Sequence, residues 1–520
     1  MAEIAASSEV HARDQARQSV GAVTWIGRLL VAAALIALVV VIGRALILFV
    51  DHAAAALDYP YTLNYGEGPL LDQAVRLANG VDLYPPDLSA PPYTITNYPP
   101  LYILAQTPFL AEYGPAFWYG RLIALASAAA AAVLIALTIH ALTRDALAAL
   151  IGGALLLTIP YVLHWGPLAR IDSLALALSW GGLFVIARWP ERWAALLLAA
   201  LLLTAAAYTR QTYLLAAPLA VFAWLIGRGR VYRGLVFAVL FGSLVLGIFA
   251  VLTVATRGGI FYHLITANVN ALDPNLITFY ADEIANHLPI FVVGGGLLII
   301  SGLIFALGRV IWRRRFPQAQ VWWLAAPYLI GAALAALTIS KVGSDINYLF
   351  EVVAACCLTA GLWVAWLRRW PPLRAAVMAL IAVQVVMATA LSEARYYPIL
   401  IERTREDRRA QVAELMQTIT TAAGPILADE HMGLLALSGQ PIQLQPFEMS
   451  QLAQAGLWDQ AGFVAALERG DYPTVMLYQP YRNPGLRFER WTPEMLNQIN
   501  ASYRPALQTA ETIVYTHIDR

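Results

Sequence analysis

Residues 21–50 read GAVTWIGRLLVAAALIALVVVIGRALILFV, and this apolar stretch decides the class of the fold. A helix needs about 20 apolar residues to cross the hydrocarbon core of a bilayer. The apolar core of a signal peptide is only about 7–15 residues long, so a cleaved leader does not explain a run of this length. We therefore predict a retained first membrane helix, preceded by a disordered cytosolic tail over residues 1–20.

Similar apolar runs recur as far as residue 391. The chain has 520 residues, of which 59% are hydrophobic and only 13% are charged, and this composition is too apolar for a soluble protein. We predict an all-α polytopic membrane bundle with about eleven transmembrane helices over residues 21–391. The expected spans are 22–50, 116–142, 147–164, 172–188, 193–209, 211–227, 233–255, 289–312, 320–340, 346–367 and 374–391.

The placement of arginine predicts the orientation of the bundle, because short cytosolic loops accumulate basic residues. Arginines gather in alternate loops, at positions 144, 188, 192, 228, 230, 233, 309, 313–315, 368, 369 and 374. These loops and the N-terminus are expected in the cytosol of a cell with the protein in its plasma (inner) membrane. The net charge of +1, without a basic tract interleaved with aromatic residues, argues against nucleic acid as a partner.

From residue 392 onward the composition is typical of a soluble domain. Short apolar strands are predicted at 425–428, 441–444, 474–478 and 512–516, and they alternate with helical patterns. Thr492-Pro493 has the pattern of a helix N-cap followed by a first-turn proline. We predict a small α/β domain over residues 392–520. An odd number of spans would place it outside the cytosol.

The longest polar interruption is the predicted first outer loop, residues 58–115. It carries Glu67 between two glycines, then Asp72, and it is rich in tyrosine, including Tyr65 and Tyr98. A loop of this length without bland linker composition is usually functional, and flanking glycines let the backbone approach a ligand closely. The alternative for both acids is a solvated surface position.

Further charged residues lie at the outer ends of later spans. Placing an acid as close to hydrocarbon as Asp172 costs free energy, so such an acid is usually functional or paired. Arg170 is its nearest possible partner in the sequence. Arg210 and Gln211 stand between two apolar spans, and Lys341 is the only lysine of the chain. We expect the acids and cations at this face to come together in one pocket. A guanidinium suits a phosphate and a lysine adds a point charge, whereas arginine snorkelling to lipid headgroups is the alternative.

Metal and thiol chemistry have weak signals. The chain contains neither an HExxH motif nor paired CxxC motifs, and its outer histidines are scattered. A divalent metal ion held by two of them with Glu67 or Asp172 is kept as an alternative cofactor. Cys356 and Cys357 are adjacent within a span and point in different directions on a helix, so we predict that they pack in the core.

Several motifs resemble a known family. Residues 97–104 (NYPPLYIL), 108–110 (PFL) and 113–114 (YG), ahead of Arg121, resemble the start of the family named after dolichyl-phosphate-mannose protein mannosyltransferases. The resemblance runs over residues 58–225, through the segments 169–172 (ARID) and 208–211 (YTRQ). It extends to the bacterial aminoarabinose transferase-like enzymes of the GT-C superfamily. The resemblance implies a GT-C-like bundle that uses a polyprenyl-phosphate sugar at the outer face of the membrane.

The same resemblance suggests roles for individual residues. Glu67 is similar to the first-loop acid of that superfamily, although many relatives have two adjacent acids where this chain has Glu67 and Gly68. Asp172 is similar to the acid that opens a later span. Lys341 and Tyr348 resemble a basic and an aromatic position of the later outer loop.

These observations together predict an integral-membrane glycosyltransferase, inverting by analogy with the superfamily. Glu67 is the predicted general base, supported by Asp172, and Glu67→Gln is expected to abolish transfer while the protein stays folded. The predicted partners are membrane lipid, a polyprenyl-phosphate sugar donor and an extracytoplasmic acceptor that is a lipid, a glycan or a protein. Two alternatives stay open: a transporter of a lipid-linked or small solute, and a non-catalytic glycan-binding scaffold. The predicted substrate-binding residues are Tyr65, Asp72, Tyr98, Arg170, Arg210, Gln211, Lys341 and Tyr348.

Overall fold

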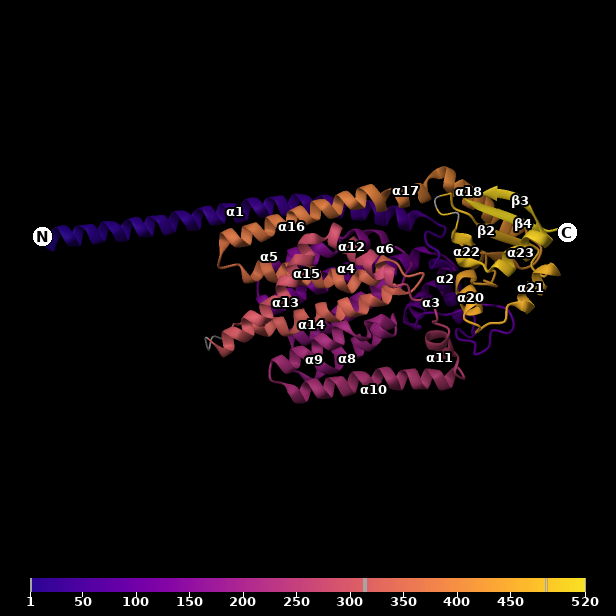
Figure 1. Ribbon diagram of the computed structural model, residues 1–520, viewed down its shortest axis with the longest axis horizontal. Helices are drawn as coiled ribbons and strands as arrows, with labels where there is room; N and C mark the ends of the chain where they lie inside the picture. The colour runs from indigo at the N-terminus through magenta and orange to yellow at the C-terminus, as the bar shows by residue number, and fades with distance from the viewer. Residues whose placement is uncertain (1, 312–315, 482, 484, 520) are drawn as a thin grey trace.

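The protein is a bundle of long, roughly aligned helices with a separate domain at one end. The structure is a computed structural model that describes residues 2–311, 316–481, 483 and 485–519, with side chains described from Trp25 onward except at position 309. The N-terminus lies at one end of the long axis and the C-terminal domain lies at the other (Figure 1). We call the end of the bundle next to this domain the domain end.

Seven helical segments in the described residues are long and apolar enough to cross a membrane. The main helices of these segments are α1 (Ala2–Asp58), α4 (Trp118–Thr143), α10 (Val231–Ala255), α13 (Pro289–Val310), α14 (Gln318–Ala336), α15 (Phe350–Trp366) and α16 (Pro371–Leu391). The shorter apolar helices α5 (Ala146–Leu156), α8 (Trp193–Ala207) and α9 (Ala216–Gly227) complete the bundle together with α7 (Asp172–Arg188). The prediction of an all-α polytopic bundle is confirmed, and the count of eleven spans stays a prediction.

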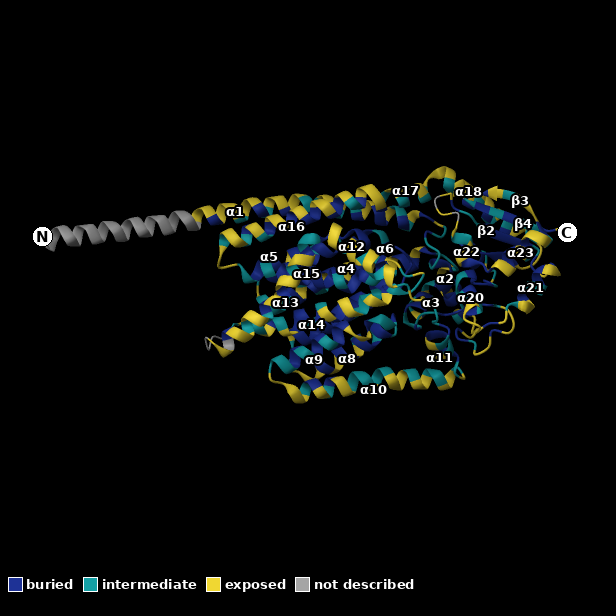
Figure 2. Cartoon of the chain, viewed as in Figure 1, coloured by how far each residue is buried: buried dark blue, intermediate teal, exposed yellow. Residues whose placement is uncertain are grey.

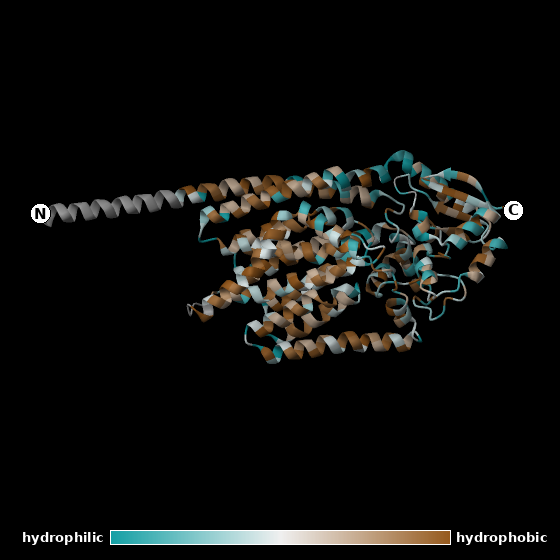
Figure 3. Cartoon of the chain, in the orientation of Figure 1, coloured by the Kyte–Doolittle hydropathy of each residue, from teal (hydrophilic) through white to brown (hydrophobic). Residues whose placement is uncertain are grey.

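Burial separates a packed interior from faces made for lipid (Figure 2). Leu246, Val251 and Val254 on α10 are each 68–80% exposed, and such apolar exposure suits the hydrocarbon of a bilayer. Helix α7, in contrast, is buried on nearly all sides, as expected for a helix that other helices surround. Apolar side chains dominate the bundle, and hydrophilic ones become frequent towards the C-terminal domain (Figure 3). The chain is therefore a multi-pass membrane protein.

Small residues bring α5 and α15 together. A Cβ atom on Gly152 would lie 3.1 Å from the carbonyl oxygen of Cys357, so the two backbones are in close contact. Small residues at helix contacts are the usual means of packing within membranes. Cys356 and Cys357 are buried and form no disulfide, which confirms their predicted packing role.

Short helices and loops at the domain end carry the polar side chains. They include α2 (Glu67–Ala78), α3 (Leu101–Tyr113), α6 (Pro160–Trp165), the 3₁₀ helices η1 (Gln211–Leu214) and η4 (Ile346–Leu349), α11 (Gly259–Phe261), the π-helix η2 (Tyr262–Thr266) and α12 (Pro274–His287). A third 3₁₀ helix, η3 (Leu337–Ser340), follows α14.

The last membrane helix continues beyond its predicted end. Helix α16 passes through a π-helical turn, η5 (Ser392–Tyr396), into α17 (Tyr397–Thr404), and the candidate span covers 371–404 without a break. The domain boundary predicted at residue 392 therefore lies inside continuous helical structure. Residues 1–20, predicted to be a disordered tail, fall in the part of the chain whose side chains lie outside the description.

The C-terminal domain contains a mixed sheet of order β1-β2-β4-β3. Strands β1 (Ile426–Ala428) and β2 (Thr474–Tyr478) are parallel, whereas β4 (Thr512–His517) runs antiparallel to both β2 and β3 (Tyr503–Thr509). The helices of this domain are α18 (Glu406–Thr421), α19 (Gly433–Leu437), α20 (Pro446–Gln454), α21 (Ala461–Glu468), α22 (Leu486–Arg490) and α23 (Pro493–Ser502). The predicted cap is present, since the Thr492 hydroxyl accepts a hydrogen bond from Met495 N.

The domain is joined to the first outer loop. The strand predicted at 441–444 is wrong, because these residues do not enter the domain sheet. Leu444 instead forms a parallel bridge with Tyr93, and Tyr93 N donates to Gln443 O at 2.8 Å. At a second contact the backbones of Gly68 on α2 and Gly433 on α19 meet so closely that a Cβ on Gly68 would lie 2.7 Å from Gly433 N. The first outer loop thus links the bundle to the domain.

Candidate active site

Glu67, the first residue of α2, is fully buried and paired with Arg121 on α4. Each carboxylate oxygen accepts one hydrogen bond from the Arg121 guanidinium at 2.9 Å. Oε1 also accepts from Ala169 N at 2.8 Å, and Oε2 accepts from Leu63 N at 2.7 Å. Burial opposes ionisation of Glu67, but the guanidinium and the two backbone donors outweigh it and lower the pKa.

The Glu67–Arg121 pair is a structural junction. Arg121 also donates to the carbonyl oxygen of Ala56 in the last turn of α1 at 2.7 Å, and to that of Tyr61, just after α1, at 2.6 Å. Through Ala169 the same pair holds the turn between α6 and α7. Since four donors already occupy the Glu67 oxygens, no lone pair is left for an acceptor hydroxyl. The base role of Glu67 stays a prediction, and these contacts weigh against it.

Asp172, the first residue of α7, is the centre of a second buried cluster. Its Oδ1 accepts from the Arg210 guanidinium and from the Asn347 side-chain amide, the latter at 3.0 Å. Its Oδ2 accepts from Trp165 Nε1 at 2.8 Å. Three separate segments thus converge on one carboxylate, as the sequence interpretation required of Asp172 and Arg210. Within this cluster Tyr348 stacks on Arg210, with the guanidinium carbon 4.2 Å from the ring centroid.

Arg170 lies beside this cluster and is 8% exposed. It donates to the Tyr98 hydroxyl at 3.1 Å, and its guanidinium faces the rings of Tyr98 and Trp165 at 5.7 Å and 5.5 Å. It also covers the backbone of Gly66, where a Cβ would lie 1.2 Å from Nη1 of Arg170. Glycine is thus required at position 66 for this packing. Arg170 is not paired with Asp172, the partner that the sequence suggested, and no described carboxylate lies within 4.0 Å of it.

The remaining predicted residues divide between this region and other places. Gln211 donates to Asn97 O at 3.1 Å, and the Tyr65 hydroxyl donates to Glu448 of the C-terminal domain at 2.9 Å. Lys341, however, donates to Asn268 Oδ1 at 2.8 Å, within the loop that precedes α12. Its predicted phosphate contact therefore stays a prediction without support from its hydrogen bonds.

Asp72 serves the junction with the C-terminal domain. Its Oδ1 accepts from Ile442 N at 3.1 Å, and burial raises the pKa of this carboxyl to about 6. The side chain is 3% exposed. A buried acid that receives a backbone hydrogen bond from the neighbouring domain is explained by docking, so substrate binding by Asp72 stays a prediction.

Three partners of the predicted residues were missed from sequence. Arg121 carried a usable signal, because a charge inside a membrane span demands a partner. Asn347 and Trp165 are neutral and gave no such signal.

A divalent metal ion does not fit the predicted ligands. Glu67 and Asp172 are each paired with a guanidinium, so neither offers a free carboxylate to a cation. The part of the chain that the structure describes holds no group of three or more His, Cys, Asp or Glu side chains arranged for a metal ion.

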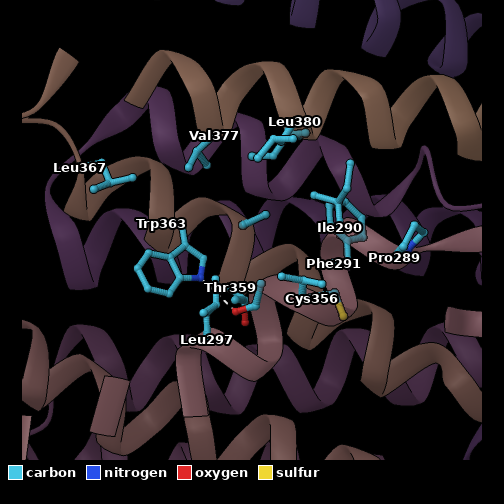
Figure 4. A pocket seen from close by; sticks show the side chains of 14 residues that line it. Pro289, Ile290, Phe291, Leu297, Cys356, Thr359, Trp363, Leu367, Val377 and Leu380 are labelled. Atoms are coloured by element: carbon cyan, nitrogen blue, oxygen red, sulfur yellow. Dashed lines mark hydrogen bonds between the residues drawn. The ribbon is translucent and has the colours of Figure 1, made fainter. Parts of the chain in front are cut away.

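An apolar cavity of about 440 Å³ lies between α13, α15 and α16 (Figure 4). It extends from Pro289 at the start of α13 to Leu367 just after α15, and its lining includes Gly294, Ala360, Trp363 and Leu380. It thus runs along α15, the helix that begins directly after η4, which contains Tyr348.

The fold is similar to that of solved membrane glycosyltransferases. ArnT from Cupriavidus metallidurans in the apo state matches with a TM-score of 0.53 at 15% identity, over 95% of this chain and 98% of ArnT. The same protein bound to undecaprenyl phosphate matches with a TM-score of 0.55 at 15% identity, over 92% of this chain and 97% of ArnT. AglB is an oligosaccharyltransferase from Archaeoglobus fulgidus, solved in complex with an inhibitory peptide and a dolichol-phosphate. It matches with a TM-score of 0.47 at 11% identity, over 91% of this chain and 74% of AglB.

No protein-family model matches the chain, and no curated relative does. At 15% identity this similarity shows the fold, and the chain has the GT-C fold that the resemblance in the sequence implied. It shares this fold with ArnT along almost the whole length of both chains.

Proposed function

We propose that this protein is an integral-membrane glycosyltransferase that moves a sugar from a polyprenyl-phosphate donor to an acceptor on the side of the membrane away from the cytosol. The reaction would take place at the domain end of the bundle. The observation that carries the proposal is Arg170, a buried guanidinium whose charge no described carboxylate neutralises at ion-pair distance. Its Nε is buried and has no hydrogen-bond partner among the described residues, so the guanidinium keeps a donor for an anion from outside the chain.

A lipid phosphate would supply Arg170 with an anionic hydrogen-bond acceptor. A guanidinium presents a planar fork of donors that matches phosphate oxygens. Arg210 lies in the adjacent cluster with one guanidinium nitrogen committed to Asp172, so it adds positive charge to the same region. The similarity of fold to ArnT bound to undecaprenyl phosphate supports a polyprenyl phosphate over a soluble nucleotide.

The chemistry of transfer follows from these positions. As the acceptor hydroxyl attacks the anomeric carbon, negative charge grows on the departing phosphate, and fixed cations stabilise it most. Arg170 and Arg210 supply this positive charge, while Asp172 holds Arg210 in place. Tyr98, Gln211 and Tyr348 complete the donor side. A single displacement of this kind inverts the anomeric carbon.

The outward orientation is supported by the arginines at the opposite end of the bundle. Arginines lie at or next to helix ends there, at positions 144, 188, 228, 230 and 368. Short loops rich in arginine face the cytosol.

A transporter is less well supported. Ion and substrate sites of transporters lie near mid-membrane between repeated halves, whereas the charged clusters described above lie at one end.

The polyprenyl tail is proposed to occupy the apolar cavity between α13, α15 and α16. Ala360→Trp would fill this space, and we expect it to weaken binding of undecaprenyl phosphate about tenfold, or about 1.4 kcal/mol. Leu246→Trp on the lipid-facing surface of α10 is the control, and it should leave binding unchanged. Titration of the purified protein in nanodiscs, followed by native mass spectrometry, measures both. Equal affinity of the Ala360→Trp variant and wild type would remove the tail from this cavity.

The proposed donor class is tested by binding of undecaprenyl phosphate to the Arg170→Gln variant. We expect its affinity to fall by about 10- to 150-fold, because a charge-assisted hydrogen bond to a buried anion contributes about 1.5–3 kcal/mol. Arg257→Gln removes an exposed arginine at the domain end and should bind as wild type does. If the wild-type protein binds no undecaprenyl phosphate, or if Arg170→Gln binds it equally well, the proposal is wrong.

A further inference from the structure

A second cavity of about 170 Å³, lined by apolar and polar side chains, has Trp165 in its wall. Asp345 stands at this cavity, directly before η4, and His52 of α1 and His164 of α6 form part of its wall. Arg403 of α17 and Asn64 of the first outer loop complete its polar lining. The mechanism described above uses none of these side chains.

Trp165 connects this cavity to the donor cluster. Its ring lines the cavity, while its Nε1 donates to Asp172 at 2.8 Å. Arg170 faces the same ring at 5.5 Å. Asp345 is also near the donor cluster, because Asn347 follows it by two residues. The Asn347 side chain donates to Asp172, and its carbonyl oxygen accepts from Arg210 at 3.2 Å. A group bound in the cavity would therefore lie next to the donor cluster.

The polar side chains of the lining can bind a ligand that carries hydroxyl groups. His52 is 2% exposed, and the Nδ1 atoms of His52 and His164 have no hydrogen-bond partner among the described residues. Buried polar atoms are normally satisfied, so unpaired ones at a cavity call for a ligand that can hydrogen-bond. One carboxylate, one amide, one guanidinium and two imidazoles together offer both donors and acceptors. This mixture suits a neutral polyhydroxylated group, and the volume suits a single sugar ring.

Asp345 has a carboxylate oxygen available to a ligand, whereas Glu67 does not. Its Oδ1 accepts one hydrogen bond, from Ile346 N at 2.7 Å, and its side chain is open to the cavity. Glu67 is enclosed by four donors, whereas Oδ2 of Asp345 accepts no hydrogen bond from the described residues. Asp345 is exposed, so this free carboxylate oxygen is accessible to a group bound in the cavity.

We propose that this cavity is the acceptor site, that it takes a sugar-like group with a free hydroxyl, and that Asp345 is the catalytic residue that accepts the proton of this hydroxyl. This inference rests on the proposed glycosyltransferase function. The acceptor oxygen forms a bond to the anomeric carbon while the bond from that carbon to the phosphate oxygen breaks. The electron pair of the broken bond leaves with the polyprenyl phosphate, and the acceptor proton moves to the Asp345 carboxylate.

The test compares transfer with donor binding in the full-length protein. Proteoliposomes would receive undecaprenyl-phosphate-linked radioactive sugars, a pentose and a hexose, together with membranes as the source of acceptor. We expect Asp345→Asn to lower transfer at least about 100-fold, the usual contribution of a general base. Undecaprenyl phosphate affinity should stay within about twofold of wild type, because the donor contacts are intact. Asp273→Asn is the matched control, since Asp273 caps α12 through Asn275 N at 2.9 Å and does not line the cavity.

A second variant separates catalysis from folding. Asp345→Ala leaves space for formate, and added formate should restore part of its transfer if a carboxylate acts at this point. Transfer by Asp345→Asn within about threefold of wild type would overturn the inference and leave the proposed function standing. Loss of transfer together with loss of lipid binding would also overturn it, because Asp345 would then be structural. A wild-type protein that neither binds the lipid nor transfers sugar would instead refute the proposed function itself.

Discussion

Glu67→Gln is expected to destabilise the protein by about 3–5 kcal/mol, the usual effect of breaking a buried ion pair by removing one partner. Arg121 would keep its charge with no carboxylate at hand, and both residues are fully buried. A glutamine amide also places N–H groups where Glu67 now accepts from Arg121, Leu63 and Ala169. Transfer should fall with the folded fraction, since the junction that positions Arg170 is lost.

Thermal unfolding of purified variants measures this effect. Asp471→Asn is the matched control, because Asp471 pairs with Arg469 at 2.6 Å on an exposed surface of the C-terminal domain. Exposed ion pairs contribute at most about 1 kcal/mol, so this control should unfold close to wild type. If Glu67→Gln unfolds at the wild-type temperature and yet transfers no sugar, the junction role is wrong and the original assignment of Glu67 as the base is right.

Gly66→Ala is expected to abolish most activity while the fold survives. A Cβ at this position would lie 1.2 Å from Nη1 of Arg170, so the guanidinium has to move. The backbone φ of Gly66 is −76°, which alanine adopts without strain, and the displaced atoms are the end of a flexible side chain. A misplacement of about 1 Å in a site can cost about 100-fold in rate, and we expect a loss of this order here.

The control for this variant is Gly462→Ala, where a Cβ would meet nothing within 4 Å. Transfer, undecaprenyl phosphate binding and the unfolding temperature are measured on both variants. Unchanged transfer by Gly66→Ala would show that Arg170 is free to leave its position without cost, and its role at the phosphate would have to be abandoned.

Much of the membrane architecture could be predicted because hydrocarbon dictates the length and the composition of each span. The span expected at 233–255 is observed as α10 over Val231–Ala255. The cap at Thr492 was equally predictable, since its signal is local in the chain. Strand β3 was missed because it follows α23 directly at Tyr503, without turn residues between them.

The pairing of side chains across the chain could not be predicted in the same way. Asp172 and Arg210 were correctly expected to meet, since a buried acid and a buried cation at one membrane face need each other. Lys341 attracted attention by its rarity in the sequence, which says nothing about its neighbours. The partner of Glu67 was missed although Arg121 carries a charge into a membrane helix, and the roles of Trp165 and Asn347 depend on packing alone.

Arg170 is proposed to bind the phosphate of a polyprenyl donor. A cryo-EM structure of the protein with undecaprenyl phosphate tests this most directly. The account predicts phosphate density within hydrogen-bond distance of the Arg170 guanidinium, beside Arg210 and Tyr348, with the lipid tail leading into the bundle between α13, α15 and α16. Phosphate density elsewhere, with Arg170 still held only by Tyr98, Trp165 and Gly66, would contradict it.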